Sequence, residues 1–243
     1  MIEIINLHKT FGGNRVLRGV DLRIEEGESL AIIGRSGSGK SVLLKHIVGL
    51  LYPDEGYVKF EGQVIGELKE KELYRIRNKF GFLFQGAALF DSMTVEENIS
   101  LPLVENNHGI SKRKVDNAVA EKLDLVGLPN IQKQKPSELS GGMKKRVGLA
   151  RALITNPDYI LYDEPTTGLD PLMSDSIDEL IVELNDKLNV TSIIVTHDMQ
   201  SVKKAADKVA MLHEGKIYFV GTPEDMNREE DETVKNFIRR TGY

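Results

Sequence analysis

The strongest chemical signal in the chain is the octapeptide GRSGSGKS, which has the spacing of a phosphate-binding P-loop. It contains Gly34, Arg35, Ser36, Gly37, Ser38, Gly39, Lys40 and Ser41. We expect Lys40 to reach the β- and γ-phosphates of a nucleoside triphosphate, and the Ser41 hydroxyl to ligate Mg²⁺. Gly37 and Gly39 would let the backbone wrap closely around the phosphates. The alternative is a glycine-rich turn without a function.

A pair of carboxylates follows another strand-like run. Asp163 and Glu164 come directly after YILY, at the edge where open α/β sheets bind ligands. We expect Asp163 to join the Mg²⁺ shell, directly or through water, and Glu164 to polarise an attacking water. Alone, such a pair would be interpreted as a solvated turn. Its occurrence beside a P-loop favours the catalytic interpretation.

Two further polar residues end strand-like runs. Gln85 closes FGFLFQ and His197 closes TSIIVTH. Each could be an ordinary capping or surface residue. With a nucleotide site nearby, we expect Gln85 to coordinate Mg²⁺ or water and His197 to donate a hydrogen bond to the γ-phosphate.

A second anion site is indicated by SELSGGMKKR. A hydroxyl and two glycines stand where a helix should begin, and Lys144, Lys145 and Arg146 follow at once. Basic residues in a first helical turn are disfavoured by roughly 0.3–1 kcal/mol each, so an anion is expected there. We expect Ser140 and the amides after it to contact that anion, and the basic side chains to add only field or solvent-facing charge.

The elements around these motifs predict an α/β protein. The first sixty residues contain strand-like runs joined by turn signals, and SLAIIG is typical of a strand that is buried on both faces. SVLLKHIVGLL predicts a helix, and the region from about Glu67 to Asn156 is mostly helical in character. Alternation of strands and helices then resumes, and VAMLHEGKIYFVGTP predicts a hairpin. The charged tail has Val234, Phe237 and Ile238 at helical spacing, for docking on this subunit or on a neighbouring one.

Composition limits the classes of function. The 243 residues fit one large domain, and 32 Lys and Arg against 37 Asp and Glu give a net charge of -5. That balance is too mild for a dedicated nucleic-acid binder, so we expect no nucleic acid. The absence of cysteine excludes disulfides and thiolate metal sites. Without a signal core or a long apolar run, we expect a soluble protein that reaches a membrane only through a partner.

In this order, the motifs resemble an ATP-binding cassette (ABC) ATPase subunit across nearly the whole chain. They are GRSGSGKS (34–41), the glutamine loop at Gln85, LSGGM (139–143), YILYDEP (159–165), TGLD (167–170) and His197. The resemblance implies an α/β P-loop ABC ATPase cassette with a mixed-sheet core, an antiparallel β subdomain and a mostly helical subdomain. Residues 1–86 and 157–224 would form the nucleotide-binding core with its β subdomain, 87–156 the helical subdomain and 225–243 the C-terminal tail.

The resemblance also implies a head-to-tail homodimer that binds two ATP and Mg²⁺. Ser140, Gly141 and Gly142 would bind the γ-phosphate of ATP held by the opposite P-loop, and Asp170 would cross the same interface. Phe11 and Val16 would contact the nucleotide, with Phe11 stacked on adenine, although an inward-packed strand residue is an equally open interpretation of Phe11. A symmetric pairing would satisfy both anion sites of a chain that has one P-loop.

Within this family, LFQGAALFDSMTVEENISLPL and LSGGMKKRVGLARAL resemble the ATPase subunits of MCE-type phospholipid transporters. That implies integral-membrane permease subunits, contacted through residues 87–93, an MCE-domain lipid-binding protein, a small accessory subunit and a place on the cytoplasmic face of the inner membrane. The alternatives are an importer ATPase for another substrate and a non-transport ABC ATPase. A P-loop kinase would leave LSGG and Asp163-Glu164 unexplained.

Overall fold

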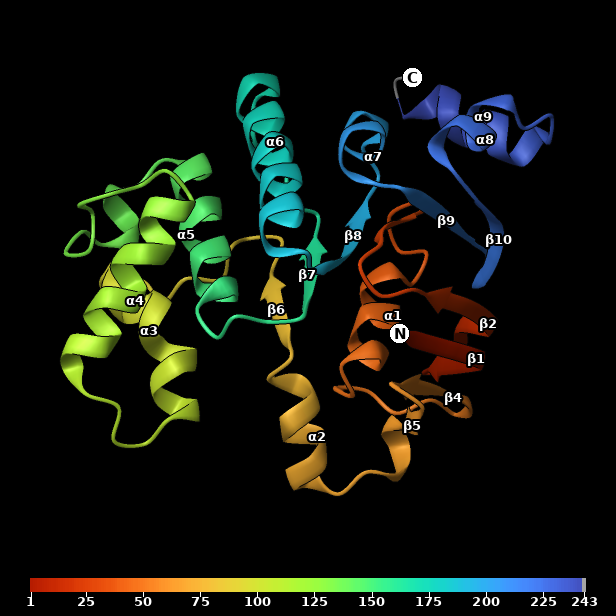
Figure 1. Ribbon diagram of the computed structural model, residues 1–243. Coiled ribbons are helices and arrows are strands. Elements are labelled where there is room, and N and C mark those ends of the chain that lie inside the picture. The colour runs from red at the N-terminus through yellow and green to blue at the C-terminus, as the bar shows by residue number, and fades with distance from the viewer. Residues whose placement is uncertain (242–243) are drawn as a thin grey trace.

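A computed structural model describes residues 1–241. Its central sheet has six strands in the order β10-β9-β3-β8-β7-β6 (Figure 1). The strands are β3 (Ser29–Ile33), β6 (Phe80–Leu83), β7 (Tyr159–Asp163), β8 (Thr191–Thr196), β9 (Lys208–His213) and β10 (Lys216–Gly221). All neighbouring pairs are parallel except the β9–β10 hairpin. The parallel strands therefore bring the ends of β3, β6, β7 and β8 to one edge.

A second, antiparallel sheet has the order β2-β1-β4-β5. Its strands are β1 (Ile2–Phe11), β2 (Asn14–Ile24), β4 (Glu55–Phe60) and β5 (Gln63–Val64). Apolar side chains of this sheet and of β3 and β8 form one buried core with α1 (Lys40–Ile47). The sequence prediction of an α/β protein with a mixed and an antiparallel sheet is confirmed.

The remaining helices cover the central sheet or extend from it. They are η1 (Ile65–Glu67), α2 (Glu70–Arg77), α3 (Val95–Asn106), α4 (Lys112–Leu125), η2 (Pro136–Glu138), α5 (Gly141–Leu153), α6 (Pro171–Leu188), α7 (Met199–Ala205), α8 (Pro223–Arg228) and α9 (Glu232–Arg240). Figure 1 shows α3, α4 and α5 together on one side of β6–β8, with β1, β2 and β4 on the other. The predicted helical segment 87–156 holds α3, α4, η2 and α5, while α8 crosses the predicted start of the tail at residue 225.

One predicted helix is shorter than expected. SVLLKHIVGLL was expected to be helical throughout, but α1 ends at Ile47. Gly49 has φ +67°, and a Cβ placed on it would lie 2.7 Å from a methyl carbon of Leu73. This left-handed turn ends the helix and allows close packing against α2.

The C-terminal tail packs on its own subunit. Val234 and Phe237 are buried in a cluster with Ile33 of β3 and Met199 and Val202 of α7, and Ile238 packs at its edge. This agrees with the first of the two interpretations of the tail. The tail thereby brings α9 to the edge of the sheet where β3 and β8 end.

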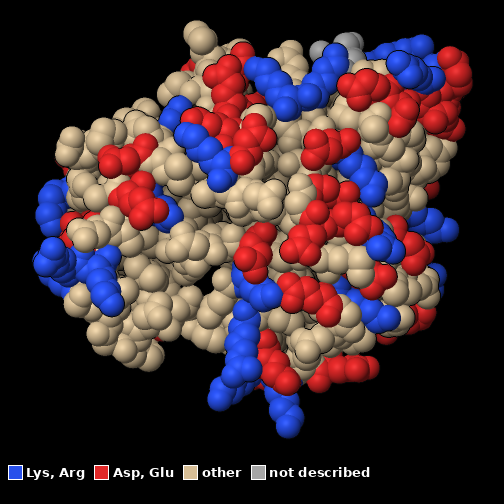
Figure 2. Space-filling view, viewed as in Figure 1, with Lys and Arg blue, Asp and Glu red and all other residues tan. Residues whose placement is uncertain are grey.

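Two surface properties bear on function. Among the described residues no helix is both long and apolar enough to cross a membrane. On the face drawn in Figure 2, acidic and basic side chains are interspersed.

Candidate functional site

The predicted P-loop connects β3 to α1 at the edge of the central sheet. Gly34, Gly37 and Gly39 all have positive φ. Gly39, with φ +105°, is the N-cap residue, so the loop leads directly into the first turn of α1. A Cβ on Gly34 would lie 2.5 Å from the Leu212 carbonyl oxygen, so only glycine fits. The loop backbone is therefore free to surround a phosphate at the N-terminus of α1.

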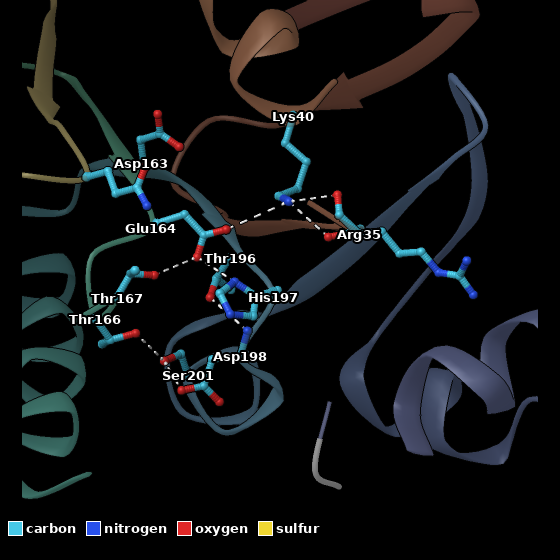
Figure 3. Close-up of polar contacts among 12 residues, drawn as sticks. Arg35, Lys40, Asp163, Glu164, Thr166, Thr167, Thr196, His197, Asp198 and Ser201 are labelled. Atoms are coloured by element: carbon cyan, nitrogen blue, oxygen red, sulfur yellow. Dashed lines mark hydrogen bonds and ion pairs between the residues drawn. The ribbon is translucent and has the colours of Figure 1, made fainter. Parts of the chain in front are cut away.

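Lys40 is drawn into this loop. Its side chain is 7 % exposed, and Nζ donates to the carbonyl oxygens of Gly34 at 2.9 Å and Arg35 at 3.3 Å. Nζ also lies 3.7 Å from Glu164 Oε1 (Figure 3). Burial lowers the pKa of Lys40, and the nearby Glu164 carboxylate opposes that shift. The ammonium thus stands at the loop with weak partners that a phosphate could replace.

Asp163 and Ser41 meet across the sheet edge. Ser41 Oγ donates to Asp163 Oδ1 at 3.2 Å. Burial raises the pKa of Asp163, although the Ser41 hydrogen bond counteracts it. A hydroxyl and a carboxylate at this distance form an oxygen donor set of the kind that Mg²⁺ prefers. The two residues therefore fit the predicted metal site.

Glu164 lies at the centre of the polar contacts. Its Oε2 accepts hydrogen bonds from Thr167 Oγ1 at 3.0 Å and is 2.8 Å from His197 Nδ1. In Figure 3 its carboxylate lies between Lys40 and His197, while that of Asp163 points to a different side. Glu164 has φ +50°, and its N–H donates to the Val195 carbonyl at 2.8 Å. This left-handed backbone aims the carboxylate at the P-loop, at a cost of roughly 1–3 kcal/mol.

A cavity of about 400 Å³ opens beside these groups. It is lined by Arg35, Ser36, Gln85, Glu164, His197, Phe237, Arg240 and Thr241. The predicted residues Gln85, Glu164 and His197 are therefore brought together by the fold. The contributions of Phe237, Arg240 and Thr241 were missed, because only the tertiary position of α9 places them there.

Phe11 and Val16 lie on the antiparallel sheet. Phe11 is 43 % exposed at the end of β1, with Lys9 Nζ 5.5 Å from the centre of its ring. Its outward position is compatible with stacking on a base. Val16 packs on the P-loop, since a Cβ on Gly39 would lie 3.0 Å from Val16 Cγ1.

The LSGG segment forms a separate, open site. Ser140 is the N-cap of α5, and its Oγ accepts from the Met143 N–H at 3.3 Å. Ser140 and Gly141 are exposed, and neither they nor Gly142 are among the residues that line the cavity beside the P-loop. Gly142 is packed against Met173 of α6, whose N–H donates to the N-cap Asp170. The two helix ends predicted to bind anions therefore do not share the cavity beside the P-loop.

We expected the basic residues of α5 to add only field or solvent-facing charge, and the solvent-facing part is wrong for Lys145, which is buried. Lys145 is 5 % exposed, and its ammonium donates to the carbonyls of Gln85 and Glu164. Arg146 donates to Val126 O at 2.6 Å and to Ser176 Oγ at 2.8 Å. The helical spacing of Gly142, Lys145 and Leu149 is the sequence signal that could have placed Lys145 on the buried face.

Comparison with known proteins places this geometry in a family. The sequence profile of the ABC transporter family matches residues 17–167. The probable ribonucleotide transport ATP-binding protein mkl of Mycobacterium leprae is 41 % identical over 243 residues, which cover 99 % of this chain and 70 % of that protein. The intermembrane phospholipid transport system ATP-binding protein MlaF of Haemophilus influenzae is 39 % identical over 98 % of this chain and 90 % of that protein. Methionine import ATP-binding proteins match at similar identity.

A solved structure supports both the fold and a dimeric arrangement. The dimeric post-hydrolysis structure of the ATP-binding cassette MJ0796, bound to ADP and Pi, superimposes with a TM-score of 0.83 and 35 % identity. The match covers 92 % of this chain and 99 % of that chain. The similarity therefore extends over the P-loop, the carboxylate pair and the LSGG helix together.

Proposed function

The chain belongs to the ABC transporter family, and from that premise we propose that it powers a membrane permease for phospholipids by hydrolysing two ATP molecules between two copies of itself. ABC cassettes are ATPases coupled to transport, and their dimers work with a membrane permease. The more detailed proposals concern the residues that carry out ATP hydrolysis, the metal ion, the transported substrate and the cellular location.

The observation that carries the proposal is the arrangement around Glu164. One carboxylate oxygen faces Lys40 at the P-loop, and the other is held by Thr167 and His197. A water between this carboxylate and a γ-phosphate on the P-loop would be polarised by Glu164. His197 would orient that carboxylate through its 2.8 Å contact and would donate a hydrogen bond to the γ-phosphate. The group is thus pre-positioned where phosphoryl transfer needs a water-orienting base.

The remaining contacts follow from the same placement. Lys40 would exchange the carbonyls of Gly34 and Arg35 for phosphate oxygens, which bind an ammonium more strongly. Ser41 and Asp163 would hold Mg²⁺, with Gln85 beside them, and the ion would neutralise phosphate charge. Phe11 and Val16 would lie against the nucleotide on the side of the antiparallel sheet.

The open end of α5 supports the dimer. Ser140, Gly141 and Gly142 would contact the γ-phosphate on the partner subunit, with Asp170 at the same interface. Only a second copy supplies a P-loop to this end. Because ATP would contact both subunits only in the closed dimer, it would favour that state, and hydrolysis would release it.

The phospholipid assignment is supported by the relative MlaF, which matches 98 % of this chain and 90 % of its own length. Met143 in the LSGGM motif also favours the phospholipid assignment, because this segment resembles that of the MCE-type ATPase subunits. An MCE-domain lipid-binding protein and a small accessory subunit would complete the assembly at the cytoplasmic face of the inner membrane. Relatives named for ribonucleotide and methionine transport make an importer of another substrate the alternative.

The ATPase part is tested with Glu164→Gln, which keeps the size of the side chain but removes its basicity. We expect the variant to lose at least 100-fold in turnover and to elute as an ATP-bound dimer in the presence of Mg²⁺, measured by size-exclusion chromatography with light scattering. The matched control is Glu179→Gln on α6, which should behave as wild type. A Glu164→Gln chain that hydrolyses ATP at the normal rate would falsify the role of Glu164.

The cargo is tested by purification from native membranes. The tagged chain should retain a multi-span permease and an MCE-domain protein, and the complex should move fluorescent phospholipid between vesicles only with ATP. The Glu164→Gln complex serves as the control. Transport of methionine or a ribonucleotide, with no phospholipid movement, would overturn the lipid assignment but not the ATPase.

A further inference from the structure

Lys145 is a buried cation that none of the proposed steps uses. It lies on the first turns of α5, five residues after the N-cap Ser140, and is 5 % exposed. Its ammonium donates to the carbonyl of Gln85, after the end of β6, and to that of Glu164 at 3.1 Å, after the end of β7. The Lys145 side chain therefore links α5 to the loop after β6 and to the loop after β7.

The position is costly unless these contacts are made. Burial lowers the pKa of Lys145, although the carboxylates of Glu164 and Asp163 oppose that effect. Among the described residues, its ammonium donates to the carbonyls of Gln85 and Glu164. A buried ammonium held in this way fixes its partners, because leaving a buried charge without hydrogen bonds is strongly unfavourable.

The peptide groups on both sides of the Glu164 Cα are held as a result. Its N–H donates to Val195 O at 2.8 Å, and its C=O accepts from Lys145. Because the residue has φ +50°, its carboxylate direction depends on both contacts. Movement of α5 relative to β7 would therefore rotate the Glu164 side chain.

Arg151 secures the same loop two turns further along α5. Arg151 is 8 % exposed, and its guanidinium donates to Ala87 O at 2.6 Å and Ala88 O at 2.7 Å. Both alanines have positive φ, +58° and +47°. The segment from Gln85 to Ala88 is thus attached to α5 by two buried cations, and it should move with that helix as one body.

We propose that Lys145 is a positioning residue that couples the two ATP sites of the dimer, by setting the direction of Glu164 according to the position of α5. The inference rests on the proposed function, because Ser140 at the start of α5 would contact the ATP of the partner subunit. The contact of Ser140 with the partner's ATP would fix the position of α5. Lys145 would then fix the backbone of Glu164, so ATP hydrolysis at one site of the dimer would depend on whether ATP occupies the other site. A rigid helix with a charged link is a physically continuous path for such coupling.

The experiment uses Lys145→Met, which keeps the length of the side chain but removes its donors. Lys144→Met is the matched control, since it removes the same charge from the adjacent, half-exposed position. We expect kcat of Lys145→Met to fall at least 10-fold, KM for ATP to stay within twofold and the Hill coefficient to approach 1. Lys144→Met should stay within twofold of wild type in all three.

A double variant separates positioning from general damage. If Lys145 acts through Glu164, single-turnover hydrolysis by Lys145→Met combined with Glu164→Gln should be no slower than by Glu164→Gln alone. Multiplied losses, or a Lys145→Met variant that matches Lys144→Met, would overturn the inference. If Lys145→Met does not fold, Lys145→Leu, which also lacks hydrogen-bond donors, replaces it, and wild-type turnover and cooperativity in that variant would overturn the inference too. Absence of ATPase in the wild-type chain would instead reject the proposed function.

Discussion

Two helix N-termini of this chain are candidate anion sites, and they are built in different ways. α1 begins after Gly39, has no side-chain cap and starts with Lys40, which is buried among groups of the same subunit. α5 begins after Ser140, which caps its own helix, and its first two residues include the exposed Gly141. The first site is enclosed by β3, β7 and β8, whereas the second ends at the surface.

The difference indicates which site can bind ATP alone. At α1 the fold supplies a cationic side chain, a carboxylate, a hydroxyl and a cavity within one chain. At α5 it supplies the Ser140 hydroxyl and backbone N–H groups at an exposed helix start. We therefore expect α1 to hold the nucleotide and α5 to act only after another subunit presents one.

The largest effects on ATP turnover are expected from substitutions that disable the N-terminus of α1 and, separately, the N-terminus of α5. Lys40→Ala should abolish turnover, with at least a 100-fold loss, and weaken ATP binding by at least 10-fold, because its ammonium would contact the phosphates. Ser140→Arg should abolish turnover equally but leave ATP binding to the monomer within twofold. Steady-state turnover and equilibrium binding of a fluorescent ATP analogue check both. Equal losses of ATP affinity in the two variants would contradict the inference that only the α1 site binds ATP within one subunit.

His197 sharpens the description of the enclosed site. His197→Ala should lower kcat by about 10- to 100-fold, because the carboxylate of Glu164 loses its 2.8 Å contact. ATP affinity should change by less than threefold, since Lys40 and the P-loop remain. Turnover and binding assays on the same preparation test this, with the exposed His108→Ala as control. Unchanged turnover would show that Thr167 alone suffices to orient Glu164.

The enclosed site was the more predictable of the two regions. Lys40, Asp163 and Glu164 are placed by short motifs at strand ends, so local sequence and the parallel sheet determine them together. The burial of Lys145 was not predicted, because its carbonyl partners come from β6 and β7, sixty and nineteen residues away along the chain. The end of α1 was also missed, because the packing of Gly49 on Leu73 depends on tertiary structure.

A smaller effect is expected at the open end. Met143 packs against the apolar core of the helical region rather than toward solvent. A thioether cannot donate a hydrogen bond, so this position does not supply an N–H to phosphate through its side chain. Met143→Gln should keep turnover within threefold of wild type and lower stability by about 1 kcal/mol. ATPase assays and urea unfolding test this, and damage as large as that of Ser140→Arg would contradict it.

The helix that supports the open end contains a carboxyl group whose protonation should affect stability. Asp178 of α6 is 2 % exposed, its Oδ2 accepts from Ser201 Oγ at 2.8 Å, and its Oδ1 has no partner in the described structure. Burial raises the pKa of Asp178 to about 6, and the carboxylate of Asp198 adds to the effect. An acid with a raised pKa in the folded state destabilises the fold where it is ionised, and this cost disappears as the pH falls from about 7 toward 4.

Asp178→Asn removes that cost, and the gain should be larger at high pH. Its free energy of unfolding should exceed that of wild type by about 1–2 kcal/mol at pH 8, and the difference should shrink to about half that value at pH 5, where Asp178 is largely protonated in the folded state. Urea denaturation at both pH values measures this. Asp175→Asn is the control, since that exposed carboxylate pairs with Lys204 at 2.6 Å and its removal should change stability by less than about 0.5 kcal/mol at pH 8. A pH-independent difference for Asp178→Asn would mean that the pKa of Asp178 is not raised in the folded state, because only equal folded and unfolded pKa values leave stability independent of pH. Asp178 would then be ionised in the interface with α7 at both pH values.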